Sequence, residues 1–171
     1  MPHQILPKLK MNTGEQWGPP LWKLFHMLAE QAGKQTDLIL QQQENRLWEA
    51  LLQQTKTIIG CEACRLHVDH YIQTHPFMGC SYDYLKTYMR NFFYEFHEYV
   101  NRQTLKPSFD RSLLSDTYSN LDEFEPTFKQ FTTQMELLID AQKIQREMYQ
   151  QWLDSFVQLS ILCQIPNMTL G

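Results

Sequence analysis

Residues 85–101 read LKTYMRNFFYEFHEYVN, and the spacing of their apolar side chains decides the fold class. The apolar positions recur at intervals of three and four: Leu85, Met89, Phe92, Phe93, Phe96 and Val100. These intervals place them on one face of an α-helix, which turns once every ~3.6 residues. We therefore predict an amphipathic helix over roughly residues 81–104 that ends before Lys106-Pro107.

The same spacing predicts three helices before this one. The first opens at Trp17-Gly18-Pro19-Pro20 and runs to about residue 31, since a proline in the first turn removes an N–H that has no helical partner. The second is capped by Asp37 and reaches about residue 58. The third starts at the cysteines near residue 61 and reaches about residue 74, before Pro76.

Two more apolar stripes follow residues 108–120, which read as short and irregular. The stripes cover residues 124–138 and 144–159. No stretch alternates with a period of two for long, so we expect no sheet. The periodicity predicts an all-α protein, with a bundle of four or five helices followed by one or two helices of extension.

Charge is distributed unevenly along the 171 residues, whose formal net charge is −4. Residues 1–111 hold 12 Lys and Arg against 11 Asp and Glu, whereas residues 112–171 hold 3 against 8. A nucleic-acid binder would carry a basic surplus, so we expect no nucleic-acid partner. No apolar run approaches the ~20 residues of a membrane span, and the first residues form neither a signal nor a transit peptide.

Two of the four cysteines form a Cys-x-x-Cys motif, Cys61-Glu62-Ala63-Cys64, at a predicted helix start. In that position the helix dipole and unpaired N–H groups favour the thiolate, which is the nucleophile of disulfide exchange. His67 and His70 follow at the same spacing, so a zinc site is an alternative, as is a pair of structural cysteines. We favour the redox dithiol, because four ligands along one helix cannot all converge on one ion. A thioredoxin-like fold would need a βαβ pattern, which is absent.

Two further pairs of residues stand four positions apart on predicted helices. His97 and Asn101 lie on one face of the fourth helix, and Trp22 and His26 share a face of the first. Each pair alone is typical of core packing. Beside a dithiol, the two pairs together suggest a pocket for a flat aromatic cofactor.

Three motifs, in order along the chain, make the sequence similar to the Erv/ALR family of FAD-dependent sulfhydryl oxidases. Residues 17–26 read WGPPLWKLFH and fit the family's opening Gly-x-x-x-Trp-x-x-x-His. Residues 61–67 read CEACRLH and fit Cys-x-x-Cys-x-x-His. Residues 97–110 read HEYVNRQTLKPSFD and fit the family's His-Asn-x-Val-Asn stretch, with the Lys-Pro that follows. The resemblance spans about residues 14–119.

The resemblance implies a four-helix bundle with a short fifth helix that holds FAD at its mouth. It divides the chain into an N-terminal arm (1–13), an Erv/ALR-like domain (14–119) and an acidic helical extension (120–171). Cys61 and Cys64 would form the catalytic disulfide, with Cys64 against the flavin and Cys61 facing incoming thiols. The residues expected to bind FAD are Gly18, Trp22, His26, His67, His97, Asn101, Lys106 and Tyr118; no metal ligand is expected.

The sequence departs from the family pattern at several positions. Gly60 stands where relatives often have proline, Glu98 replaces the second residue of His-Asn-x-Val-Asn, and Arg111 replaces a structural cysteine. No second Cys-x-x-Cys is present as a shuttle. We expect the remaining cysteines, Cys80 and Cys163, to be structural or free, rather than shuttle thiols.

The implied activity is a thiol oxidase that forms disulfide bonds in proteins and passes the electrons through FAD to O2, giving H2O2. The implied partners are protein thiols, a small dithiol relay protein and a second copy of the chain in a homodimer. Without a shuttle pair or presequence, the chain looks more like the compact oxidases of large cytoplasmic DNA viruses, which act in the host cytoplasm or virion, than like those of the mitochondrial intermembrane space. The alternative is a non-enzymatic helical interaction module with structural or zinc-binding cysteines.

Overall fold

The computed structural model describes residues 16–169, and this part of the chain contains helices and no strand. The predicted N-terminal arm, residues 1–13, lies outside the described residues. The helices are α1 (Gly18–Glu30), α2 (Leu38–Thr55), α3 (Glu62–Thr74), α4 (Leu85–Gln103), α5 (Leu114–Tyr118), α6 (Phe124–Asp140) and α7 (Arg146–Leu162). The predicted all-α fold is confirmed. A 3-10 turn, Lys56–Ile58, extends α2 to the predicted end.

Local sequence explains where these helices begin. The first turn of α1 contains two prolines, and Asp37 caps α2 by accepting hydrogen bonds from the N–H groups of Ile39 and Leu40. Cys61 is the N-cap of α3. The chain therefore turns into α3 at the first residue of the Cys-x-x-Cys motif.

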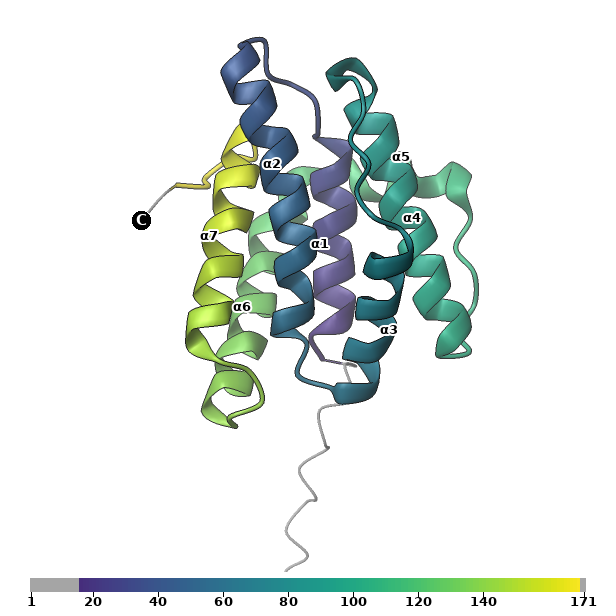
Figure 1. Cartoon of the computed structure of the whole chain (residues 1–171), viewed down its shortest axis with the longest axis vertical. Helices are drawn as coiled ribbons and strands as arrows, with labels where there is room; N and C mark the ends of the chain where they lie inside the picture. The colour runs from purple at the N-terminus through teal and green to yellow at the C-terminus, as the bar shows by residue number, and fades with distance from the viewer. Residues whose placement is uncertain (1–15, 170–171) are drawn as a thin grey trace, which may run out of the picture.

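The helices form one bundle around α1 (Figure 1). Helix α4 packs against α1, and α3 packs against α4. Helices α6 and α7, which lie side by side in Figure 1, pack against α1 and α2 respectively. No helix in the described part of the chain is long and apolar enough to cross a membrane.

The C-terminal hairpin, which we define as α6, α7 and the turn at residues 141–145, is part of the same hydrophobic core as α1–α4. Phe131, Trp152 and Phe156 are fully buried, and the rings of Trp152 and Phe156 stack with their centroids 4.9 Å apart. The apolar stripe of the extension is thus buried on the bundle of its own chain. The boundary expected near residue 120 does not divide this core.

Candidate functional site

A disulfide bond joins Cys61 and Cys64 at the N-terminus of α3. The Sγ atom of Cys61 lies 3.4 Å from the backbone N of Cys64, which donates a hydrogen bond to it, and Glu62 occupies the first turn. The helix dipole is positive at this end, so it stabilises a thiolate on Cys61 when the bond is reduced.

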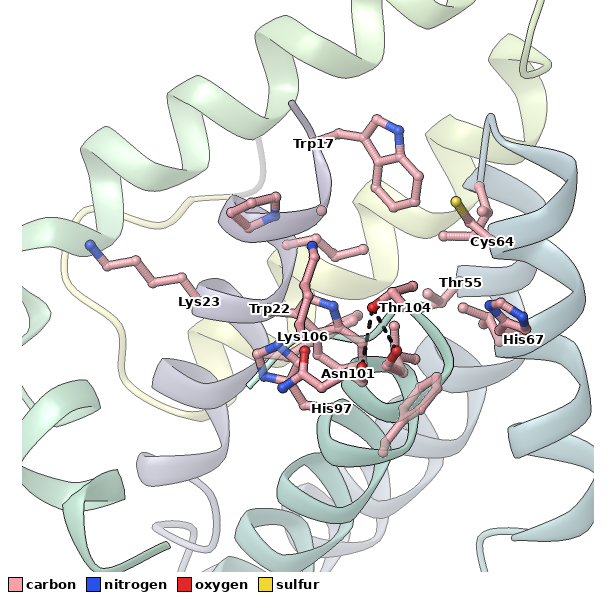
Figure 2. Close-up of a pocket in the computed structure, with 18 of the residues that line it drawn as sticks. Trp17, Trp22, Lys23, Thr55, Cys64, His67, His97, Asn101, Thr104 and Lys106 are labelled. Atoms are coloured by element: carbon pink, nitrogen blue, oxygen red, sulfur yellow. Dashed lines mark hydrogen bonds between the residues drawn. The ribbon is translucent and has the colours of Figure 1, made fainter. Parts of the chain in front are cut away.

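A cavity of about 420 Å³ opens beside this disulfide. Its walls come from α1, the end of α2, α3, α4, the loop after α4, and α5 (Figure 2). The residues that line it are Trp17, Gly18, Pro19, Leu21, Trp22, Lys23, Phe25, Thr55, Ile59, Cys64, His67, Val68, Phe96, His97, Val100, Asn101, Thr104, Lys106, Thr117 and Tyr118. Cys64 is therefore in the wall of the cavity, whereas Cys61 is not among the lining residues.

The structure brings together seven of the eight residues expected to bind a cofactor. Gly18, Trp22, His67, His97, Asn101, Lys106 and Tyr118 all line the cavity. His26 does not line it; it lies one layer behind, with its imidazole in contact with His97. Their role in binding stays a prediction, but the placement in one cavity agrees with it.

The rings of Trp22 and His26 contact His97, and Tyr118 supports His26. The His97 ring stacks on the indole of Trp22, with 4.4 Å between centroids and 6° between planes. The Nε2 atom of His26 lies 2.9 Å from Nδ1 of His97, so one of these nitrogens donates a hydrogen bond to the other. On its other side His26 stacks on Tyr118, 4.6 Å between centroids. The polar pair is thus held between aromatic rings from α1 and α5.

Both imidazoles are neutral at physiological pH. Burial, together with the neighbouring His97, lowers the pKa of His26 to about 3. Burial lowers the pKa of His97 to about 4; Lys106 adds to this effect and Glu98 opposes it. His97 can therefore take part in a hydrogen bond at the cavity wall without carrying charge.

Lys106 supplies positive charge on a loop that the end of α4 holds in place. The backbone N–H of Lys106 donates to the carbonyl of Asn101, 2.8 Å away, and Leu105 between them adopts a left-handed φ of 56°. This is a Schellman cap, in which a left-handed residue reverses the chain at a helix end. The cap places Asn101 and Lys106 in the same wall of the cavity.

Glu98 does not line the cavity but anchors the same loop. Its carboxylate accepts hydrogen bonds from the Ser108 hydroxyl and, at 2.9 Å, from the backbone N–H of Phe109. Burial would raise the pKa of Glu98, but hydrogen bonds from Ser108, Phe109 and Asn101 outweigh burial and hold the pKa below its usual range. The departure from the family motif at residue 98 thus gives a contact between α4 and the loop.

Arg111 makes a second attachment of this loop to α4. Its guanidinium forms an ion pair with Glu95 and lies over the ring of Tyr94, 4.4 Å from the centroid. The Tyr94 hydroxyl in turn donates to the carbonyl of Phe109 at 2.9 Å. Where the resemblance implied a missing disulfide, this chain has a set of non-covalent contacts.

Helix α5 is fixed by an ion pair between α4 and α1 that is buried on its acidic side. Arg90 on α4 donates from Nε to Glu30 on α1 at 2.7 Å, and from Nη2 to the Ser115 hydroxyl at 3.0 Å. Glu30 is almost fully buried. These contacts hold α5 against α1 and α4, and so place Tyr118 at the cavity.

Several lining residues could not be identified from the sequence. Phe25 and Phe96 stand on helical stripes, and such spacing alone is typical of core packing. Trp17, which is buried, was noted only as part of a motif. Thr55 had no sequence signal, because its place in the wall depends on how the end of α2 meets α3.

The remaining cysteines are both free thiols. Cys163 is fully buried, and this burial, aided by the nearby Glu44, raises its thiol pKa well above the usual value. Burial also raises the pKa of Cys80. All four cysteines lie in the described part of the chain, and no disulfide there joins the hairpin to the bundle. A protonated Cys163 is a poor nucleophile.

The zinc alternative has no geometric support in the described part of the chain, where no group of three His, Cys, Asp or Glu is placed to hold a metal ion. Cys61 and Cys64 bond to each other. His67 lines the cavity, while His70 is exposed and stacks on Tyr99.

The cavity fits a flat aromatic ligand with an anionic group. Trp22, Phe96 and His97 offer ring faces, Asn101 and His97 offer hydrogen bonds, and Lys106 offers charge for a phosphate. The volume lies within the ~300–1,000 Å³ range of small-molecule and cofactor sites.

The model of the Erv1 / Alr family matches residues 19–120, which contain α1–α5 and most of the lining residues. No curated protein and no solved structure matches the chain.

Proposed function

We propose that this chain, which belongs to the Erv1/Alr family, is an FAD-dependent thiol oxidase that forms disulfide bonds in proteins. The net reaction is 2 R–SH + O2 → R–S–S–R + H2O2. One observation carries the proposal: a disulfide whose second sulfur lines an aromatic cavity and whose first sulfur stands outside it.

Cys61 is the sulfur that substrate attacks. A substrate thiolate forms a bond to Cys61 Sγ, the bond between Cys61 and Cys64 breaks, and Cys64 leaves as a thiolate. A second substrate thiolate then attacks the substrate sulfur of the mixed disulfide. The substrate is released as a disulfide, and Cys61 leaves as a thiolate stabilised by the N-terminus of α3.

Cys64 lies where it can pass electrons to a cofactor bound in the cavity, because cleavage of the disulfide leaves the Cys64 thiolate in the cavity wall. FAD, when bound, supplies the two-electron chemistry that accepts these electrons and delivers them to O2. The residues that would hold it are those expected from the motifs. Trp22, Tyr118 and His97 offer ring faces, Asn101 and His67 offer polar contacts, and Lys106 pairs with phosphate.

Neutral histidines suit this site. A charged imidazolium would have to be desolvated in the wall, whereas the low pKa values of His26 and His97 keep the pair uncharged. His97 can therefore bind a polar edge of an aromatic ring, while Lys106 meets anionic groups. His26, behind His97, fixes the orientation of the His97 ring.

Protein thiols are the proposed substrates, delivered directly or through a small dithiol relay protein. The first turns of α3 beside Cys61 leave Ala63, Arg65 and Leu66 exposed, Leu66 at 61%. A protein chain can therefore reach Cys61.

We also propose that the chain forms a homodimer and acts in the host cytoplasm or virion, as the compact viral oxidases do. Such a dimer would use a face that the C-terminal hairpin does not cover.

The test is the absorbance spectrum of the purified protein together with oxygen uptake. The oxidase is expected to carry about one flavin per chain and to consume O2 and release H2O2 when dithiothreitol is added. A colourless protein that consumes no oxygen after incubation with FAD would favour the non-enzymatic interaction module.

A further inference from the structure

The C-terminal hairpin touches the chain directly before the redox disulfide, at Gly60. A Cβ atom built on Gly60 would lie 3.0 and 3.1 Å from the two terminal methyl carbons of Leu138 and 3.5 Å from Cβ of Lys143. Gly60 does not have a left-handed φ, unlike Gly33 and Gly79. The lack of room for a side chain therefore explains why residue 60 is a glycine, because Leu138 packs directly on the backbone that leads into Cys61.

Leu138 is itself held firmly. It is almost fully buried, and its carbonyl accepts a hydrogen bond from the N–H of Lys143 at 2.9 Å, which closes a Schellman cap around Gln142. Across the turn, Arg146 donates from both terminal nitrogens to the two oxygens of Glu136, at 3.2 and 2.9 Å. The turn that faces Gly60 is thus closed on both sides.

Helix α7 supports the same stretch from a second direction. Nε1 of Trp152 donates to Oγ1 of Thr55 at 3.1 Å, and both side chains are buried. Thr55 lines the cavity, and the 3-10 turn that follows it also packs against α7. The hairpin therefore holds residues 55–60 at two points, one at each end.

We propose that the C-terminal hairpin positions the redox centre, with Leu138 as a positioning residue that acts through Gly60 on Cys61. This inference rests on the proposed thiol oxidase function. In disulfide exchange the attacking sulfur, Cys61 Sγ and the leaving Cys64 Sγ line up as one bond forms and the other breaks. A shift of the Cys61 backbone turns this line away from incoming thiols, and small misplacements of reacting groups cost large factors in rate.

The experiment compares Gly60→Ala, Leu138→Ala and the double variant with the wild type. Each oxidised protein is mixed with dithiothreitol and quenched with an alkylating reagent, and the reduction of Cys61 and Cys64 is followed by mass spectrometry. We expect each single variant to react about fivefold or more slowly. The double variant should recover to within about twofold, because Leu138→Ala removes both methyl carbons that the new Cβ would meet.

Leu159→Ala is the matched control, since it removes a fully buried leucine near the other end of α7. It should lower the free energy of unfolding, measured in urea, without slowing reduction of the disulfide. The proposal is overturned if Gly60→Ala reacts as fast as the wild type, if the double variant stays as slow as the single ones, or if Leu159→Ala slows the reaction equally. Should Gly60→Ala fail to fold, the comparison of Leu138→Ala with Leu159→Ala decides alone.

The alkylation assay measures reduction of the disulfide and does not require bound flavin. If the wild type binds no FAD, the proposed oxidase function fails, while the rates of disulfide reduction still test the role of the hairpin.

Discussion

The indole nitrogen of Trp152 donates a hydrogen bond to the hydroxyl of Thr55 across 97 positions of sequence, and both side chains are buried. The Thr55 hydroxyl in turn donates a hydrogen bond to the carbonyl of Leu51, at 2.7 Å. The C-terminal hairpin is thereby tied, through one polar chain in an apolar core, to a residue that lines the cavity.

Thr55→Val should destabilise the protein by about 1–3 kcal/mol, because it leaves the buried Nε1 of Trp152 without an acceptor. Trp152→Phe removes the donor and some volume. In a double-mutant cycle measured by urea unfolding, the two changes should couple by about 1 kcal/mol. Additive effects would show that the hydrogen bond contributes nothing to the free energy of unfolding.

The sequence predicted the helices well because each has a local signal. Apolar spacing marked all of the long ones, and the prolines of α1 and Asp37 marked two of their starts. The residues that cap three of the helix ends carry no such signal. Leu105, Gln142 and Gln164 are the left-handed residues after α4, α6 and α7, and none of them is the glycine that usually marks such a cap.

The sequence predicted those residues of the candidate site that belong to the three motifs. The motif residues converge, since Trp22, His97 and Asn101 stand on the inward faces of two helices that pack together. The motifs could not predict two features that depend on tertiary contacts. These are the position of Thr55 in the cavity wall and the need for glycine at residue 60. Thr55 depends on how the end of α2 meets α3, and Gly60 depends on the hairpin, whose packing partner cannot be read from its own periodicity.

Cys64→Ser should abolish turnover with dithiothreitol while the bound FAD is retained, because the substitution removes a sulfur without changing the aromatic walls. Cys61→Ser should also stop turnover, since substrate then has no disulfide to attack. Oxygen uptake and the flavin spectrum measure both effects. The control is Cys80→Ser, a free thiol away from the cavity lining, which should keep wild-type rates. Activity retained in Cys64→Ser would remove Cys64 from the reaction.

Stability should fall as the pH is lowered from about 6.5 towards 4, through His26 and His97. Their pKa values are about 3 and 4 in the folded protein, below the usual 6.5, so the unfolded chain binds protons first in this window. The loss by pH 4 is on the order of 3 kcal/mol for each imidazole, or about 6 kcal/mol for the two together. Urea unfolding at pH 7, 5.5 and 4.5 measures it.

His97→Gln should make this pH dependence shallower, because one buried imidazole no longer resists protonation. His70→Gln serves as the control, since that imidazole is exposed, and it should leave the slope unchanged. Equal slopes in the wild type and His97→Gln would contradict the assignment.

Glu98→Ala should weaken FAD binding by about tenfold, since the loop that carries Lys106 loses the acceptor of Ser108 and Phe109. Glu98→Gln keeps one acceptor oxygen, so its affinity for FAD should lie between those of the wild type and Glu98→Ala. FAD release is followed by the flavin remaining after ultrafiltration. An exposed carboxylate away from the loop, Glu49, supplies the comparison, and Glu49→Ala should bind FAD like the wild type.

Gln164→Gly should raise the free energy of unfolding by about 0.5–1 kcal/mol. Gln164 has a φ of 60°, where a side chain is strained and glycine is not, and the cap hydrogen bond from Ile165 to the Ser160 carbonyl stays in place. The residue is exposed, so no packing is lost. Gln164→Ala keeps the strain and should leave stability unchanged. Urea unfolding distinguishes the two, and a loss of stability in Gln164→Gly would show that the entropy of the unfolded chain outweighs the relieved strain.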